Sequence, residues 1–212
     1  MGLKVGGSEE REYTPVPEET YVGSNVAIID LGTQFNEKYQ VYRRKVLFMW
    51  EIPDVRAQFE VDGEEHDYPK VVSRQFGLTL SKRGHLRPML ERWRGTAFGP
   101  TDEIDLKDFL GVAALVQVVH NVSGERTYAN VGSIGKLLKG MEPPKIETPL
   151  MFFSFDDHET LQSVEDVLQD FPDWIKWIVD KIRLATEYGN LSKREVGDER
   201  EVAEVEDGDP PF

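Results

Sequence analysis

The sequence predicts a mainly β domain that carries a few short helices. Runs of β-branched and aromatic residues, bounded by glycine, proline and asparagine, recur between residues 21 and 134 of the 212-residue chain. A segment with helical spacing interrupts them once. The hydrophobic content of 39%, including aromatics at 10% of the chain, is sufficient for a packed core.

Five strands are expected in this region. The first, YVGSNVAIIDLGT, covers 21–33, and the second, QVYRRKVLFMWEIP, covers 40–53 and is stopped by Pro53. The acidic, turn-rich segment that follows predicts a loop or small hairpin around Asp62 and Gly63. The third strand covers 70–80. The fourth and fifth cover 112–121 and 126–134, with a hairpin turn at residues 121–125 between them.

A helix is expected between the third and fourth strands. Leu86 and Trp93 lie at helical spacing with an apolar pair between them, and Gly95 ends the helix. Asp105 caps a further short turn. The resulting order, β-β-β-α-β-β, is that of the OB-fold, a five-stranded Greek-key barrel. Small sandwiches have a similar order, whereas a ferredoxin-like domain needs a helix that residues 34–39 are too few to form.

The C-terminal part predicts two more helices after a proline-rich connector. Asp156 or Asp157 caps the first helix. The second helix starts at residues 170–172 and ends at Gly189, and Trp174 is expected on its inward face. Both should pack on the barrel or on a partner subunit. The predicted domains are a flexible arm (1–19), an OB-like domain (20–140), a connector with a helical extension (141–190) and a disordered acidic tail (191–212).

Composition argues against several classes of function. The chain contains no cysteine, which excludes disulfides, thiolate nucleophiles and zinc–thiolate sites. The four histidines show no metal-ligand spacing, and GSIGKLLKG lacks the first glycine and the Ser/Thr of a phosphate-binding loop. We therefore expect no catalysis, metal or cofactor. No apolar run approaches a membrane span, so the expected location is the cytoplasm.

The net charge of −14 is distributed unevenly along the chain. Residues 20–140 carry a net charge of +1, whereas residues 195–212 carry −7. A near-neutral centre can present a basic face, so the overall acidity does not exclude nucleic acid as a ligand.

Basic and aromatic residues interleave on the second strand. Val46, Phe48 and Trp50 share one face, which we interpret as barrel interior; Arg43 and Lys45 share the other, which in OB-folds is the ligand groove. Single-stranded nucleic acid needs cations for its phosphates and aromatic rings for its bases. The candidate nucleic-acid-binding residues are Arg43, Lys45, Arg74, Lys82, Arg83, Arg87, Arg94, Tyr39, Tyr42 and Tyr128, with Phe76 and Arg92 as further possibilities. The alternative is a solvated charged surface over core aromatics.

The last eighteen residues contain eight acids, one arginine and the final sequence DGDPPF. An acidic segment aids solubility, but that role does not explain an aromatic tip. A terminal aromatic beside a carboxylate suits an apolar pocket rimmed by Arg or Lys on a partner. When no DNA is bound, the same segment could occupy the basic groove of its own protein.

Two resemblances follow from these motifs. DGDPPF resembles the C-terminal tip of bacterial single-stranded DNA-binding proteins, which recruits replication and repair enzymes; Asp207, Asp209, Pro211 and Phe212 match, whereas Gly208 and Pro210 depart from that pattern. Residues 21–140 resemble a group of bacteriophage proteins that are regarded in part as single-stranded DNA-binding proteins. The resemblance rests on the segments YVGSNVAIIDLGTQ, RRKVLFMWEIP, LTLSKRGHLRPMLERWRG, DLKDFLG and VVHNVSGERTYANVGSI, and FPDWIKWIV extends it into the C-terminal part.

The resemblance implies an OB-type barrel without catalysis that acts in phage DNA replication or recombination in the cytoplasm of the bacterial host. The expected function is to coat single-stranded DNA and to recruit replication proteins through the tail. One alternative is a replisome adaptor or helicase-loading accessory that uses the barrel for protein contacts. Another is an acidic DNA mimic, but the near-neutral central segment with its arginines argues against it. A homo-oligomer is left open.

Overall fold

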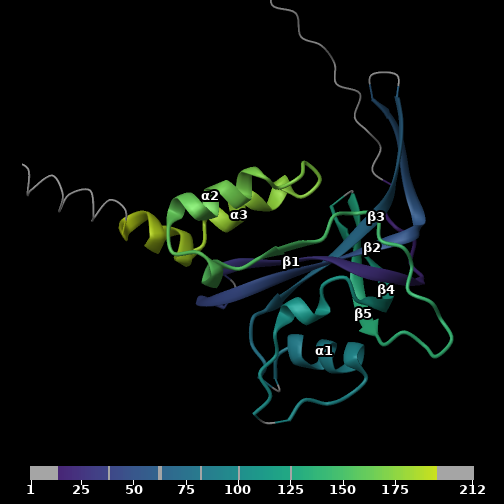
Figure 1. Cartoon of the computed structure of the whole chain (residues 1–212), viewed down its shortest axis with the longest axis horizontal. Coiled ribbons are helices and arrows are strands. Elements are labelled where there is room, and N and C mark those ends of the chain that lie inside the picture. Colours follow the sequence, from purple (N-terminus) through teal and green to yellow (C-terminus); the bar gives the residue numbers. More distant parts are fainter. Residues whose placement is uncertain are drawn as a thin grey trace, which may run out of the picture.

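The computed structural model describes residues 14–37, 39–61, 64–81, 83–99, 101–124 and 126–194, with the backbone alone at 59–61, 64 and 65. Its six strands are β1 (Thr20–Asn36), β2 (Val41–Val61), β3 (Glu64–Gly77), β4 (Ala113–Ser123), β5 (Arg126–Gly135) and β6 (Met151–Phe153). The α-helices are α1 (Leu86–Arg94), α2 (Leu161–Gln169) and α3 (Val179–Arg183), and residues 186–194 are also helical (Figure 1).

The strands form one open sheet in the order β3-β2-β1-β4-β5, with antiparallel pairing between neighbours. The short β6 lies parallel to β1 at residues 27–29. The mainly β prediction, with five strands and a helix between the third and fourth, is confirmed. The closed barrel is not confirmed, because no strand pairing joins β3 to β5.

β2 and β3 extend past the ends that the sequence predicted for them. β2 and β3 continue as a paired hairpin up to Val61 and Glu64, where a loop or small hairpin was expected; the predicted turn residues Asp62 and Gly63 lie outside the described residues. Pro53 does not end β2, because the ladder shifts register between Ile52 and Arg56 and so leaves the proline without a pairing partner.

Each face of the central strands contributes to a different hydrophobic core. Val46, Phe48 and Trp50 pack in the first core with α1, and the Trp50 and Trp93 ring centroids are 5.7 Å apart. Their assignment to the interior is therefore confirmed. The alternate residues of β2, Leu47 and Met49, lie in a second core with the C-terminal helices. The sheet is thus a middle layer, with α1 on one face and the C-terminal helices on the other (Figure 1).

The signals that define α1 and the following turn hold in the structure. Gly95 adopts φ 76°, which favours glycine, and its N–H donates to the Glu91 carbonyl at 2.8 Å. The indole of Trp93 donates to the Ala113 carbonyl at 3.0 Å and so fixes the helix against β4. Asp105 accepts from the Lys107 N–H at 2.8 Å, as expected of a cap.

The boundaries of the C-terminal helices differ from those predicted. Thr160 caps α2, while Asp156 and Asp157 belong to a separate short turn. Trp174 was expected to point inward, but 37% of it is exposed. Helical residues also continue through Gly189, and Leu191, expected in a disordered tail, is buried in the second core.

The N-terminal segment from residue 14 is packed against the sheet and is not a free arm in this part. Val16 is buried in the first core, and its carbonyl lies 2.7 Å from His120 Nε2. The His120 N–H donates to Glu18, and the Lys70 ammonium donates to the Thr14 carbonyl. These contacts explain why the segment follows the sheet despite its proline-rich sequence.

Within the residues that the structure describes, no helix combines the length and the apolar character needed to cross a bilayer. The described helices instead have one buried face. In α2, for example, Val164 and Leu168 are buried in the second core, whereas Gln162 and Asp166 are exposed.

Burial on α3 leads to a stability prediction. Ile182→Ala removes a fully buried side chain from the second core and should lower the free energy of unfolding by about 2–5 kcal/mol. Leu184→Ala, two residues away at a position that is 79% exposed, should change it by less than about 0.5 kcal/mol. Urea denaturation of both variants checks this. Equal losses in the two would show that the helix does not pack as described.

Candidate nucleic-acid interface

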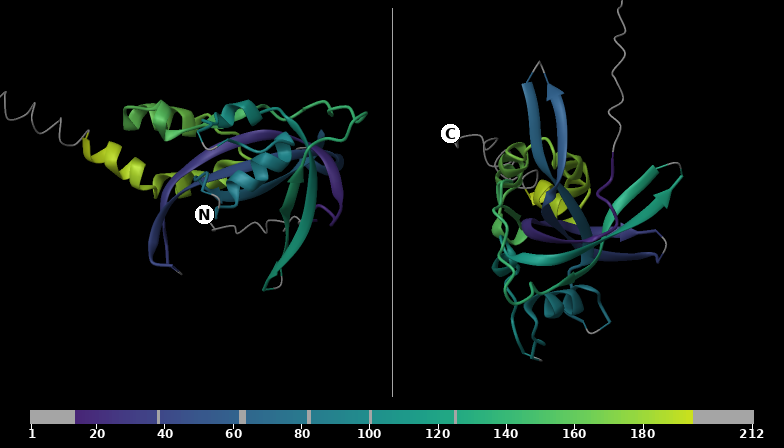
Figure 2. Two further views of the ribbon diagram at one scale, coloured as in Figure 1. Left: turned by 90° about the horizontal axis from the view of Figure 1, so that it is seen from below. Right: turned by 90° about the vertical axis from the view of Figure 1, so that its right-hand side faces the viewer.

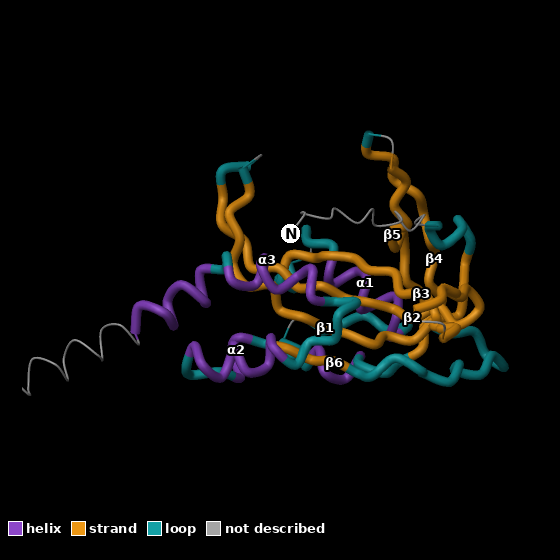
Figure 3. Tube along the Cα trace, turned by 90° about the horizontal axis from the view of Figure 1, so that it is seen from above, coloured by secondary structure: helices purple, strands orange, loops and turns teal. Residues whose placement is uncertain are grey.

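Two hairpins project from the same side of the sheet (Figures 2 and 3). One joins β1 to β2 between Asn36 and Val41, and the other joins β4 to β5 between Ser123 and Arg126. Each extends beyond the packed layers (Figure 3), and described residues near its end, such as Tyr39 and Val122, are exposed. A predicted residue can contact a ligand here only if it lies near these hairpins and, for a cation, only if its charge is not already paired.

Three cations lie together at the base of the β1–β2 hairpin, and we call Arg43, Lys45 and Lys181 the basic strip. Arg43 and Lys45 share one face of β2. Lys181 comes from α3, and its ammonium donates to Gln75 Oε1 on β3 at 3.0 Å. The Lys181 carbonyl also accepts from the Gln34 amide, and Gln34 is the register partner of Arg43. Segments far apart in the sequence thus meet here.

The electrostatics of the basic strip favour an anion. Burial lowers the pKa of Lys181, and the nearby charge of Lys45 lowers it further. Among the described residues neither ammonium forms an ion pair, and Arg43 is exposed and forms none. Two neighbouring like charges that form no ion pair among the described residues create a local positive potential that a phosphate would neutralise.

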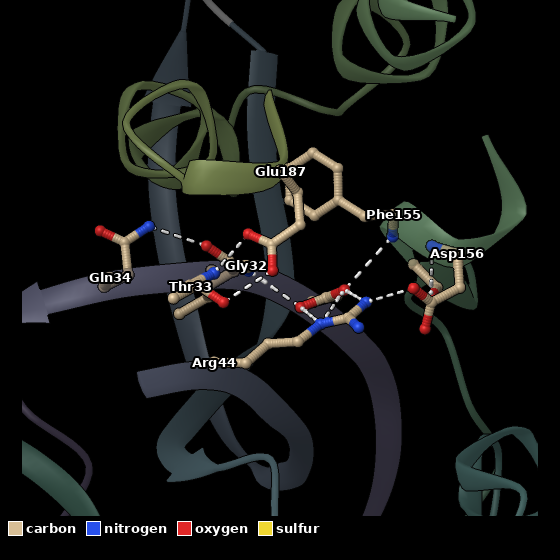
Figure 4. A network of polar contacts seen from close by, with 10 residues as sticks. Gly32, Thr33, Gln34, Arg44, Phe155, Asp156 and Glu187 are labelled. Atoms are coloured by element: carbon tan, nitrogen blue, oxygen red, sulfur yellow. Dashed lines mark hydrogen bonds and ion pairs between the residues drawn. The ribbon is translucent and has the colours of Figure 1, made fainter. Parts of the chain in front are cut away.

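Arg44 lies between Arg43 and Lys45 in the sequence, but its charge is paired within the protein. Its guanidinium contacts Asp30 at 2.5 Å and Asp156 at 2.9 Å. The hydrogen bond to Asp30 is the main cause that raises its pKa. This arginine therefore joins β1, β2 and the turn before α2, and it is not available to a ligand (Figure 4).

Exposed aromatics lie on the β1–β2 hairpin that carries Arg43 and Lys45, on the opposite face of the hairpin from these two cations. The Phe35 and Tyr42 ring centroids are 5.0 Å apart, and Tyr42 is 68% exposed. Tyr39 is exposed at the turn. On the other hairpin Tyr128 is exposed and pairs in register with Asn121 of β4. The predicted tyrosines therefore lie on both hairpins; Phe35 was missed, because it falls where a connection between strands was expected.

Two predicted phosphate contacts are instead part of the scaffold. Arg74 donates to the backbone carbonyls of Val131 and Gly132 on β5, and its guanidinium lies over the Phe76 ring. Phe76 is itself buried in the first core and offers no stacking face. Arg87 pairs with Glu91 at 2.9 Å and donates to a backbone carbonyl. Sequence alone did not reveal that these two guanidinium groups have protein partners.

The remaining predicted residues lie elsewhere. Arg83 is exposed in the connection between β3 and α1, and Arg94 lies over the Phe98 ring, so both belong to the α1 side of the sheet and not to the side that carries Lys181. The other residues predicted for DNA or partner binding, Lys82, Asp207, Asp209, Pro211 and Phe212, lie outside the described residues.

The face of β2 that carries the basic strip is open only at one end. Farther along β2, Leu47 and Met49 on that same face are buried by the C-terminal helices. The sequence analysis had assigned this whole face to a ligand groove. The exposed part is limited to Arg43 and Lys45, together with the side of α3 that bears Lys181.

A polar network holds the helices beside the basic strip (Figure 4). The Thr33 N–H and hydroxyl both donate to the Glu187 carboxylate at 2.6 Å. Gly32 adopts φ 65°, and a Cβ at this position would lie 2.4 Å from Ala185 Cβ, so the close approach of the helix requires glycine. These contacts therefore fix where residues 185–187, which follow α3, meet β1.

The described residues contain no group of three or more metal-ligating side chains that could hold an ion. No protein-family model, curated protein or solved structure matches the chain. The inference of function therefore depends on the arrangement of the hairpins, the basic strip and the exposed aromatics.

The Glu187 contacts predict acid sensitivity of the helical layer. Burial raises the pKa of Glu187, but the hydrogen bonds from Thr33 outweigh this effect and hold the pKa below its usual value. A depressed pKa in the folded state means stabilisation that is present above the unfolded pKa and is lost as the pH falls through the folded one. Glu187→Gln, whose amide cannot accept both hydrogen bonds, should therefore lose about 1 kcal/mol at neutral pH.

This difference between wild type and Glu187→Gln should shrink as the pH falls below about 4.5. Urea titrations at pH 7 and pH 4 check the effect. If both proteins lose stability in parallel between these pH values, Glu187 is not the group that titrates.

Proposed function

We propose that this chain binds single-stranded DNA without strong sequence preference and acts in phage DNA replication or recombination. The observation that carries the proposal is the basic strip, whose cations form no ion pairs within the described residues, at the base of a hairpin that exposes the Phe35 and Tyr42 rings on its other face. Cations for phosphates and rings for bases are the two parts that such a site needs.

The topology supports an OB-type barrel as the scaffold. The strand order β3-β2-β1-β4-β5, with α1 between β3 and β4, is that of an OB barrel opened between β3 and β5. Arg74 links those two strands through its bonds to the β5 carbonyls. In OB-folds the loops between strands 1 and 2 and between strands 4 and 5 flank the ligand, and the corresponding hairpins here project on one side (Figure 2).

A replisome adaptor is the second candidate, and one observation favours it. The C-terminal helices cover Leu47 and Met49 on the face that OB-folds use for ligands. The β1–β2 hairpin at the same time exposes the apolar side chains of Phe35 and Val41, which suit a protein partner. An adaptor would bind replication proteins but not oligo-dT.

The central test is the salt dependence of binding to fluorescently labelled oligo-dT, measured by anisotropy. Affinity should fall steeply with salt as counterions are released, and Arg43→Ala with Lys45→Ala should reduce the log–log slope by about 1.4, or 0.7 per phosphate contact on a single strand. The control is Lys107→Ala with Lys176→Ala, which removes the same charge from two cations that are already paired.

The control variant should retain the wild-type slope. A complete lack of oligo-dT binding by wild type at low salt would end this proposal in favour of the adaptor. An equal effect of the two double variants would show that net charge, and not the basic strip, governs affinity.

The acidic segment is proposed to recruit replication proteins through Asp207, Asp209, Pro211 and Phe212. Removing residues 195–212, which contribute −7 of the charge, should leave oligo-dT affinity unchanged or higher because a competing polyanion is lost. The same deletion should abolish capture of replication proteins by the immobilised chain. Weaker DNA binding after the deletion would contradict this role.

A further inference from the structure

Two tryptophans on the C-terminal helical layer are exposed and do not belong to either hydrophobic core. Trp174 is 37% and Trp177 56% exposed, whereas Trp50 and Trp93 are buried in the first core. Exposed large aromatics that cluster on a surface commonly mark a binding site. The question is what this surface recognises.

The local backbone brings the two rings onto one side. The Ile175 N–H donates to the Pro172 carbonyl and the Ile178 N–H to the Ile175 carbonyl, which is the three-residue spacing of a 3₁₀-helix. Side chains at i and i+3 eclipse in this geometry. Ile175 and Ile178 therefore share the fully buried side, and Trp174 and Trp177 share an outer one.

This outer side continues to the basic strip. Lys181 follows Trp177 by four residues and so lies on the same side one turn later, and Leu184, 79% exposed, follows three residues on. We call Trp174, Trp177 and Lys181 the tryptophan stripe. Arg183, on another side of α3, pairs with Glu165 of α2, whereas Lys181 reaches Gln75 of β3. The stripe therefore borders β3 and not α2.

Two ion pairs neutralise four of the charges on the helical layer. Asp173 pairs with Lys176, and Glu165 pairs with Arg183, so these charges are neutralised locally. Burial, and then the nearby charge of Lys45, lower the pKa of Lys181, which forms no ion pair within the described residues. A ligand that covers the stripe meets two aromatic rings followed by the cations Lys181 and Lys45, and then the exposed Arg43.

We infer that the helical layer is a second part of the nucleic-acid site, in which a single strand that contacts Arg43 and Lys45 continues over Lys181 and stacks bases on Trp174 and Trp177. This inference rests on the proposed function. The alternation of flat apolar rings and unpaired cations suits a ligand that carries planar bases and a regular anionic backbone. A second copy of the chain would meet uncompensated positive charge at Lys45 and Lys181, which makes it the less favourable occupant.

The test measures oligo-dT affinity for Trp174→Ala and Trp177→Ala by anisotropy. Each variant should bind roughly 5- to 100-fold more weakly, the equivalent of one lost stacked base, with little change in salt slope because no phosphate contact is removed. Trp177→Phe, which retains a ring, should recover most of the affinity. Leu184→Ala, at a more exposed apolar position that follows the stripe and cannot stack, should bind as wild type.

The outcomes separate this inference from the proposed function. If wild type binds oligo-dT and both tryptophan variants bind equally well, the inference is wrong and the proposed function stands. If wild type does not bind, both fail. If the variants, Leu184→Ala included, lose self-association in sedimentation while DNA affinity is unchanged, the stripe is an interface between copies and the inference is wrong.

Discussion

The buried carboxylate of Asp30 is the interaction on which the two-layer arrangement depends. It is 4% exposed and accepts hydrogen bonds from the Gly32 and Phe155 N–H groups and from the Arg44 guanidinium. One side chain thereby holds the bend in β1, fixes the adjacent β2, and anchors the turn that leads to α2. A carboxylate in this position is stable only with its full set of donors, since an unpaired buried charge is strongly destabilising.

This anchoring has a direct effect on the candidate site. β1 contributes Ile28 to the first core and Ile29 to the second, so this strand takes part in both cores. Because Arg44 is held by Asp30, its two neighbours Arg43 and Lys45 are presented at a defined edge of the helical layer. The basic strip thus combines a sheet contribution and a helix contribution whose relative position the buried network sets.

The sequence predicts the features that depend on neighbouring residues, and it does not predict those that depend on residues far away along the chain. Strict alternation placed Phe48 and Trp50 in the interior, because strand parity is a local property. The pairing of Arg74 with β5 was not predictable, because its partners lie about sixty residues away and are backbone atoms. Trp174 was assigned inward from a four-residue helical spacing to Ile178; the 3₁₀ turn shifts the phase, so that Ile175 takes the buried place.

The hydrogen bonds of Gly32 and Thr33 have a consequence beyond positioning. β6 accompanies β1 only from Ala27 to Ile29, and an unaccompanied strand margin offers backbone donors to which a foreign chain can add itself. The next N–H groups of β1 on Gly32 and Thr33 donate to the Asp30 and Glu187 carboxylates. Acidic side chains thus take the place of a missing neighbouring strand, and this margin of the sheet is protected from the addition of a strand of another molecule.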